Sequence, residues 1–215
     1  MSEKNSWNCG LIFLFVLMLG GCVSVAESPN PRFYMPGPMS QGEAGQKIEI
    51  ASGVIVAIGP IKIPEYQDRP QIVTKNKNGT FNFAQFDRWA EPLDSALARL
   101  INDNLVSLLP QASFQLFPCS FAIPLDYQVI VDVIQIDSQL DKELALTAQW
   151  SIIDAKNRKL LLTKRSQFTQ AINPHDYFGL TRALSLACSA LSRDIAENLA
   201  NISKNPKPIK PNTAQ

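Results

Sequence analysis

The side chains of this chain that could do covalent or acid–base chemistry include four cysteines and a single histidine. Cys22 is the most informative of them, because it follows the apolar run Leu11–Leu19 and the two glycines Gly20 and Gly21. Small residues let the backbone enter a narrow peptidase site, and the Cys22 thiol is a sulfur nucleophile that can accept a lipid group. The run suits the core of a secretory signal, which is about 7–15 residues long. It is too short for a membrane-spanning helix, which needs about 20 apolar residues.

The ending Leu19-Gly20-Gly21-Cys22 resembles a bacterial lipobox. It predicts a signal peptide over residues 1–21 and a lipidated Cys22, which needs no transmembrane helix because two acyl chains already anchor a protein stably. An ordinary cleaved signal and a retained anchor are the alternatives, because the residues before the apolar run carry no net positive charge. Val23 rather than Asp follows the cysteine, which favours the outer membrane with the protein facing the periplasm.

The other candidate residues do not form a recognisable catalytic or metal site. Cys119 and Cys188 could form a disulfide or be two small buried apolar side chains, and neither has metal-ligand spacing. His175 has no obvious partner, and no nucleophile elbow, phosphate-binding loop or dinucleotide fingerprint occurs. Three carboxylates suit a helix N-terminus better than acid–base catalysis: Asp87, Glu91 and Asp94. The sequence therefore predicts a protein that is not an enzyme and uses no cofactor or metal.

The composition of the 215-residue chain suits one domain with a sizeable core. Its formal net charge is +1, which gives no basic excess for binding nucleic acid. Residues 22–46 are rich in Pro, Gly, Ser and Glu and predict a lipidated flexible tether, in which residues 31–36 could form a short edge strand. Residues 47–203 are the predicted domain, and residues 204–215 are a predicted disordered tail.

β-branched and alternating stretches predict a mixed, mostly antiparallel β-sheet. Residues 48–58 are almost continuously apolar, as in a strand covered on both faces. Asn78-Gly79 predicts a hairpin turn between residues 61–75, whose prolines exclude a helix, and residues 80–86. A short strand is expected at residues 113–118. Three longer strands are joined closely enough for an antiparallel meander: residues 126–137, 143–154 and 159–170.

Two amphipathic segments predict helices that pack on this sheet, at residues 90–110 and 173–204. In the second, Asn173 is the expected N-cap and Pro174 the first helical residue. Gly179 is expected to weaken the first turn by about 1 kcal/mol relative to Ala. The apolar stripe of each helix is more typical of a core than of a binding groove. Together the elements predict a single α/β domain of α+β character.

Two segments are not explained by core packing or turn chemistry: Asp68-Arg69-Pro70-Gln71 and Asp87-Arg88-Trp89. Adjacent residues of an extended chain point to opposite sides, so each Asp-Arg pair seeks partners elsewhere. In one interpretation, Arg69 and Arg88 pair with internal carboxylates and join the hairpin to the first helix. In the other they contact a partner protein, since Arg and Trp are common at interfaces.

The same residues carry a family resemblance. The stretches 59–74 (GPIKIPEYQDRPQIVT) and 86–105 (FDRWAEPLDSALARLINDNL) resemble the PqiC (YmbA-type) family of ABC-type transport auxiliary lipoproteins, or membrane integrity-associated transporter subunits. The resemblance extends from about Phe33 to Ala200. It implies a non-catalytic, ring-forming subunit on the periplasmic face of the outer membrane. Its implied partner is a PqiB-like MCE-domain tunnel protein that moves lipids between the two membranes.

Two other functions compete with this expectation. A membrane-tethered lipid-binding protein would need its own apolar cavity of about 300–1,000 Å³ between sheet and helices. A small periplasmic hydrolase would need a nucleophile beside a base, which the single histidine argues against. If the chain forms a ring, residues 80–86 with Arg88 and Trp89 are the expected contact region.

Overall fold

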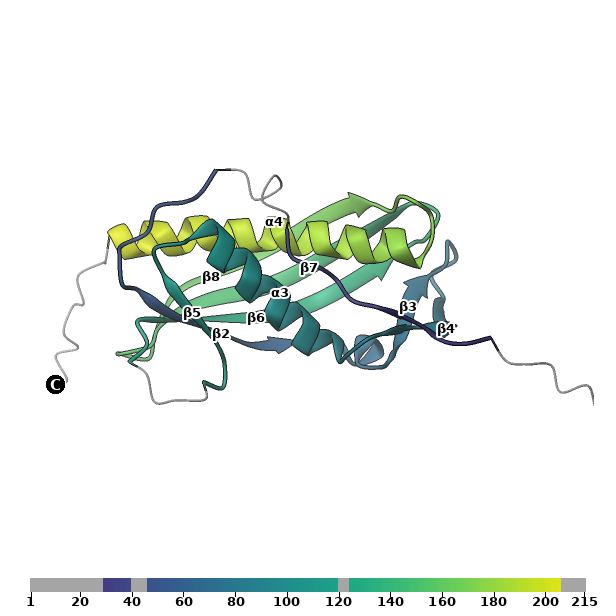
Figure 1. Ribbon diagram of the computed structural model, residues 1–215, viewed down its shortest axis with the longest axis horizontal. Helices are drawn as coiled ribbons and strands as arrows, with labels where there is room; N and C mark the ends of the chain where they lie inside the picture. The colour runs from purple at the N-terminus through teal and green to yellow at the C-terminus, as the bar shows by residue number, and fades with distance from the viewer. Residues whose placement is uncertain (1–28, 40–45, 120–123, 206–215) are drawn as a thin grey trace, which may run out of the picture. The chain divides into compact units, whose positions relative to one another are not determined.

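Two long helices lie over a β-sheet in the computed structural model (Figure 1). One hydrophobic core joins the apolar stripes of the helices to the inner face of this sheet. The structure describes residues 29–39, 46–119 and 124–205, and those from Pro31 onward belong to one compact unit. Helix α3 spans Leu93–Leu108 and helix α4 spans Tyr177–Lys204. Fully buried side chains from the helices and the sheet meet between them, among them Leu105, Ile195 and Trp150.

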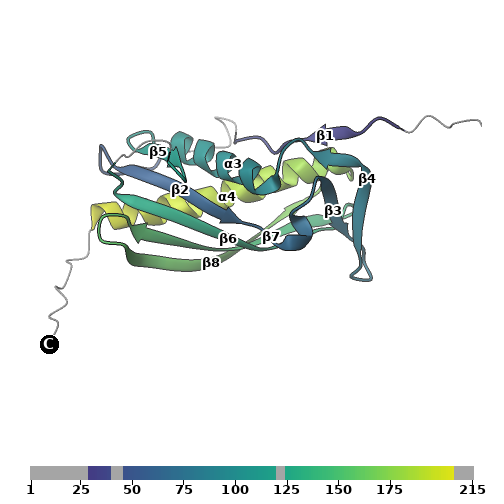
Figure 2. The same cartoon turned by 90° about the horizontal axis from the view of Figure 1, so that it is seen from below.

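The larger sheet has five strands in the order β5-β2-β6-β7-β8. β2 pairs in parallel with both β5 and β6, whereas β6, β7 and β8 form the predicted antiparallel meander. Figure 2 shows α3 and α4 on the same side of this sheet, and alternate residues of its central strands are buried beneath them. The bounds are β2 Ile55–Lys62, β5 Ser113–Leu116, β6 Tyr127–Ser138, β7 Glu143–Asp154 and β8 Lys159–Ala171.

A second, three-stranded sheet has the order β1-β4-β3. The predicted hairpin is confirmed: β3 (Gln71–Lys75) pairs antiparallel with β4 (Phe81–Trp89). Gly79 adopts a φ of +86° in the turn, a conformation that favours glycine. β1 (Arg32–Tyr34) pairs in parallel with the end of β4. The short 3₁₀ helix η1 (Glu65–Gln67) precedes β3.

The predicted α+β domain with two long helices is confirmed, but its strands divide between two mixed sheets. The predicted strand at 48–58 begins only at Ile55. Ile50 and Val54 are nevertheless buried, and the Ile48 N–H donates to the Leu108 carbonyl at 2.8 Å. The apolar run correctly predicts burial, but a loop covered by other elements can be buried as fully as a strand, so burial alone does not predict a strand. None of the described helices is both long and apolar enough to cross a membrane.

The start of α4 corrects the sequence prediction. The N-cap is Asp176, whose Oδ1 accepts the Gly179 N–H at 2.7 Å, so neither Asn173 nor Pro174 has its predicted role. The chain before the cap folds back over the first turn, and a Cβ on Gly179 would lie 1.8 Å from the Pro174 carbonyl oxygen. Glycine is therefore required here because the backbone passes so close, whatever its helix propensity.

Gly179→Ala tests this close approach. Helix propensity alone would make alanine more stable by about 1 kcal/mol, whereas the contact with the Pro174 carbonyl forces a backbone shift that costs about 1–3 kcal/mol. We expect a net loss of stability, measured as a lower urea midpoint. Gly37→Ala is the matched control, because nothing lies within 4 Å of its added Cβ. A Gly179→Ala protein more stable than the parent would contradict the packing argument.

Candidate interaction surface

A buried carboxylate holds β1 on β4. Asp87 is only 4% exposed; it accepts hydrogen bonds from Arg32 Nη2 at 3.0 Å and Tyr34 Oη at 2.9 Å. Arg32 Nε lies 2.8 Å from the same carboxylate. Burial and the hydrogen bond to Asp87 raise the pKa of Tyr34, so this hydroxyl stays a donor. Removing either donor would leave a buried negative charge poorly compensated, which is costly.

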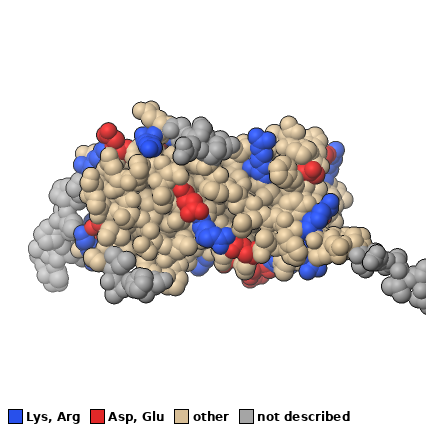
Figure 3. Space-filling view, in the orientation of Figure 1, with Lys and Arg blue, Asp and Glu red and all other residues tan. Residues whose placement is uncertain are grey.

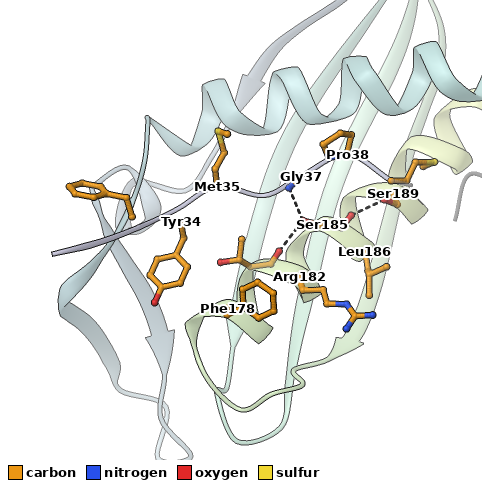
Figure 4. Close-up of a pocket in the computed structure, with 12 residues that line it drawn as sticks. Tyr34, Met35, Gly37, Pro38, Phe178, Arg182, Ser185, Leu186 and Ser189 are labelled. Atoms are coloured by element: carbon orange, nitrogen blue, oxygen red, sulfur yellow. Dashed lines mark hydrogen bonds between the residues drawn. The ribbon is translucent and has the colours of Figure 1, made fainter. Parts of the chain in front are cut away.

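The residues after β1 are fastened to both helices. The Gly37 N–H donates to Ser185 Oγ of α4 at 3.1 Å (Figure 4). The Met39 N–H donates to Asn104 Oδ1 of α3 at 2.9 Å, and Asn104 Nδ2 donates to Ser192 Oγ at 3.3 Å. The predicted short strand within residues 31–36 is thus present, and residues 31–39 are not the free tether that their composition predicted. The prolines and glycine of this segment disfavour regular secondary structure within it. The N–H groups of Gly37 and Met39 are instead satisfied by side chains of the two helices, and these contacts hold the segment on the domain.

A groove of about 380 Å³ lies between this segment and α4 (Figure 4). Three of its apolar side chains are strongly exposed: Phe33 by 62%, Met35 by 57% and Phe178 by 62%. Arg182 and two serines of α4 supply polar lining. Figure 3 shows that charges of both signs are scattered over the helix-covered face of the domain, without a concentration of basic side chains.

Strand alternation divides the Asp87-Arg88-Trp89 segment between two faces of the smaller sheet. Asp87 and Trp89 point toward the domain and are 4% and 5% exposed. Arg88 lies in register with Phe33 on one side and Gln71 on the other, so these three side chains share the opposite face. The Trp89 N–H donates to the Pro70 carbonyl at 2.7 Å, which brings the two sequence segments together.

The predicted internal pairing of Arg69 and Arg88 with carboxylates is absent from the described part of the chain. Asp87 is taken by Arg32, Glu91 pairs with Arg99, and Asp68 is exposed. The Nε atoms of Arg69 and Arg88 are hidden from water and have no acceptor among the described residues. Asp87 and Glu91 therefore serve other arginines and Asp68 is exposed, which leaves Arg69 and Arg88 for other contacts.

An aromatic cluster on the hairpin includes Arg69. Its guanidinium carbon lies 4.3 Å from the centre of the Phe83 ring. Tyr66 of η1 stacks on Phe81 with 4.7 Å between ring centres, and Phe81 and Phe83 remain 42% and 45% exposed. Lys75 bonds Asp137 of β6 at 2.8 Å, which fixes the hairpin against the larger sheet. Exposed aromatic and arginine side chains on a rigid support are typical of protein interfaces.

The candidate acid–base residues do not converge. Asp87 and Glu91 are held by arginines, and Asp94 bonds the N–H of Ser95 in the first turn of α3. His175 is exposed in the turn before α4. Within the described residues there is no group of three or more His, Cys, Asp or Glu that could hold a metal ion. The space between sheet and helices, where a lipid cavity was considered, is filled by large core side chains, among them Trp150, Leu97 and Leu191.

The two described cysteines are not paired with each other. Cys188 is buried in the core on α4, and burial raises the pKa of its thiol to about 12. Cys119 follows β5 and is partly exposed. Of the two sequence interpretations, the structure supports buried apolar packing for Cys188 and assigns no disulfide. Cys22 and the predicted signal lie outside the described residues.

The sequence interpretation missed the residues that fasten the N-terminal segment. Asn104 follows Leu100 by four residues on the apolar side of α3, and a polar residue at such a position was the available signal. Arg32 and Tyr34 gave no comparable signal, because their partner Asp87 is remote in the sequence.

A model of the family described as ABC-type transport auxiliary lipoprotein component matches residues 38–196. The chain belongs to this family. The family thus connects it with an auxiliary role in transport and with lipoproteins. No match is found among curated protein sequences.

Solved structures show the same fold at low sequence identity. A crystal structure described only as an uncharacterized protein has a TM-score of 0.65 and 16% identity, over 80% of this chain and 99% of that one. Protein XCC0632 from Xanthomonas campestris has a TM-score of 0.58 and 10% identity, over 82% of this chain and 97% of that one. At these identities the likeness concerns the fold alone.

The division of the Asp87-Arg88-Trp89 segment predicts unequal effects for two neighbouring substitutions. Trp89→Ala should lower the free energy of unfolding by about 3–5 kcal/mol, because a large buried ring is removed. Arg88→Ala should change it by less than about 1 kcal/mol, because the arginine has no ion pair to lose. Urea unfolding of both variants measures the difference. Equal losses would show that Arg88 is also structural.

The cysteine environments predict selective labelling. With a pKa of about 12, the Cys188 thiol is almost fully protonated at pH 8 as well as inaccessible. A thiol reagent should therefore label Cys119 in the native protein and Cys188 only after unfolding in urea, as read by peptide mass mapping. Rapid native labelling of Cys188 would contradict its burial in the core.

Proposed function

We propose that this protein is a periplasmic lipoprotein of the outer membrane and a non-catalytic accessory subunit of an MCE-type intermembrane lipid transport system. The observation that carries the proposal is the family match over residues 38–196. The lipobox at Cys22 supplies the anchor, and Val23 after it favours the outer membrane. The described residues supply a rigid domain whose arginines and aromatic side chains suit binding rather than catalysis.

The hairpin is the proposed contact with the MCE-domain partner or with further copies of this chain in a ring. Phe81 and Phe83 present apolar area, and Arg69 holds its charge over the Phe83 ring. Arginine and aromatic side chains contribute a large share of interface energy when a partner removes them from water. The ion pair of Lys75 with Asp137 keeps this surface in a fixed position, which lowers the entropy cost of binding.

Purification of the tagged full chain from membranes in mild detergent tests this function. We expect mass spectrometry to find acyl groups on Cys22, and an MCE-domain protein to be recovered together with more than one copy of the chain. A bare Cys22 would refute the anchor. A lipidated chain recovered without any MCE or transporter subunit would refute the transport assignment.

Phe81→Ser with Phe83→Ser tests the hairpin in the same purification. We expect recovery of the partner to fall at least tenfold, since two exposed hot-spot side chains of about 1 kcal/mol or more each are lost. Leu160→Ser is the matched control, because Leu160 is 58% exposed on β8 in the other sheet. Equal recovery with both variants would place the partner contact elsewhere on the domain.

A further inference from the structure

We propose that the end of the domain nearest the tether rests directly on the phospholipid leaflet. The contact surface consists of the exposed apolar side chains Phe33, Met35 and Phe178, with Arg88 and Arg182 placed to bind headgroup phosphates. We call this set the leaflet surface. This inference rests on the proposed function, because it requires the lipid anchor at Cys22. It adds a direct contact between the folded domain and the membrane.

The apolar part of the leaflet surface is concentrated where the tether enters the domain. Phe33, Met35 and Phe178 are each more than half exposed, and all three line the groove between the N-terminal segment and α4. Met35 and Phe178 are labelled in Figure 4. Exposed apolar side chains gathered at one place usually mark a site that binds a partner or a membrane. Phenylalanine is common among the apolar side chains of segments that enter the boundary between headgroups and acyl chains.

The charged part fits phosphate. Arg182 lines the same groove and is exposed, and Arg88 is the register neighbour of Phe33. Neither arginine forms an ion pair with a described residue. Arg88 Nε is itself hidden from water, so a phosphate contact would fall to the terminal nitrogens of this guanidinium. The groove lining contains no Asp or Glu, and the nearby Asp87 is neutralised by Arg32. A guanidinium can bind phosphate oxygens with two hydrogen bonds at once.

The length of the tether supports the leaflet as the occupant. Eight residues, 23–30, separate Cys22 from Pro31, and an extended chain spans at most about 3.3–3.6 Å per residue. The start of β1 therefore stays within about 30 Å of the anchored cysteine. Because Asp87 fastens β1 to the domain, the leaflet surface stays within the reach of this tether. The short reach raises the local concentration of headgroups at this surface.

Photocrosslinking of the full chain in intact membranes tests the inference. A photoreactive phenylalanine analogue replaces Phe33 or Phe178 in cells whose phospholipids carry ³²P, and the purified protein is assayed for covalently bound label. We expect at least tenfold more phospholipid adduct at either position than at Leu160. Leu160 is a suitable control because it is 58% exposed, close to the 62% of Phe33 and Phe178. It pairs with Ile153 near the end of β7. The smaller sheet contacts Asp137, which lies opposite the start of β7, so Leu160 is at the other end of the larger sheet.

Arg88→Gln and Arg182→Gln test the phosphate contacts in the same assay. Each should lower the adduct at Phe33 about fivefold, which corresponds to about 1 kcal/mol per arginine near a membrane surface. An unchanged adduct in both variants would refute the assignment of the arginines. Protein adducts without phospholipid at Phe33 and Phe178, or label equal to that at Leu160, would overturn the leaflet contact.

The mass of Cys22 in the same sample separates this inference from the proposed function. A lipidated Cys22 with no phospholipid adduct overturns the leaflet surface and leaves the anchor intact. A bare Cys22 refutes the anchor, and phospholipid adducts found in that case would still support the surface by itself.

Discussion

The buried Asp87 carboxylate determines how the N-terminal segment is attached to the domain. A carboxylate that is 4% exposed must be paired and hydrogen-bonded, and both of its donors come from β1. This requirement attaches the N-terminal segment to the smaller sheet. Hydrogen bonds to Asn104 and Ser185 then extend the attachment along both helices. In the proposed anchored protein, any load on the lipid would reach the domain through this strand.

The attachment changes what a lipid anchor can do. A domain on a long flexible tether can turn freely and presents all of its faces to partners in turn. In the proposed anchored protein, the first strand is fastened to the domain about nine residues after the anchor, so this end of the domain stays within about 30 Å of Cys22. The hairpin with Phe81 and Phe83 would then meet a partner in a restricted set of orientations, which favours a specific assembly.

Strand alternation explains how one short motif serves two purposes. Asp87 and Trp89 contribute to stability because they point inward, and Arg88 between them points to the opposite face beside Phe33. The Asp87-Arg88-Trp89 motif therefore has neither a purely structural nor a purely partner-facing role. Each residue has its own role, which depends on the face of the strand to which its side chain points.

Elements whose signals are local follow from the amino-acid sequence. The apolar stripes of α3 and α4, the Asn78-Gly79 turn and the closely spaced meander strands each depend on residues near one another in the chain, so their patterns could be read directly. The family resemblance also depends on short continuous stretches, residues 59–74 and 86–105, and needs no three-dimensional information. Three further features follow from long-range packing: β1 and β2 pair in parallel with distant strands, residues 31–39 lie on the domain, and Asp176 rather than Asn173 caps α4. These features depend on contacts between remote segments or on backbone passing within a few ångströms of other backbone, and neither leaves a periodic signal in the sequence.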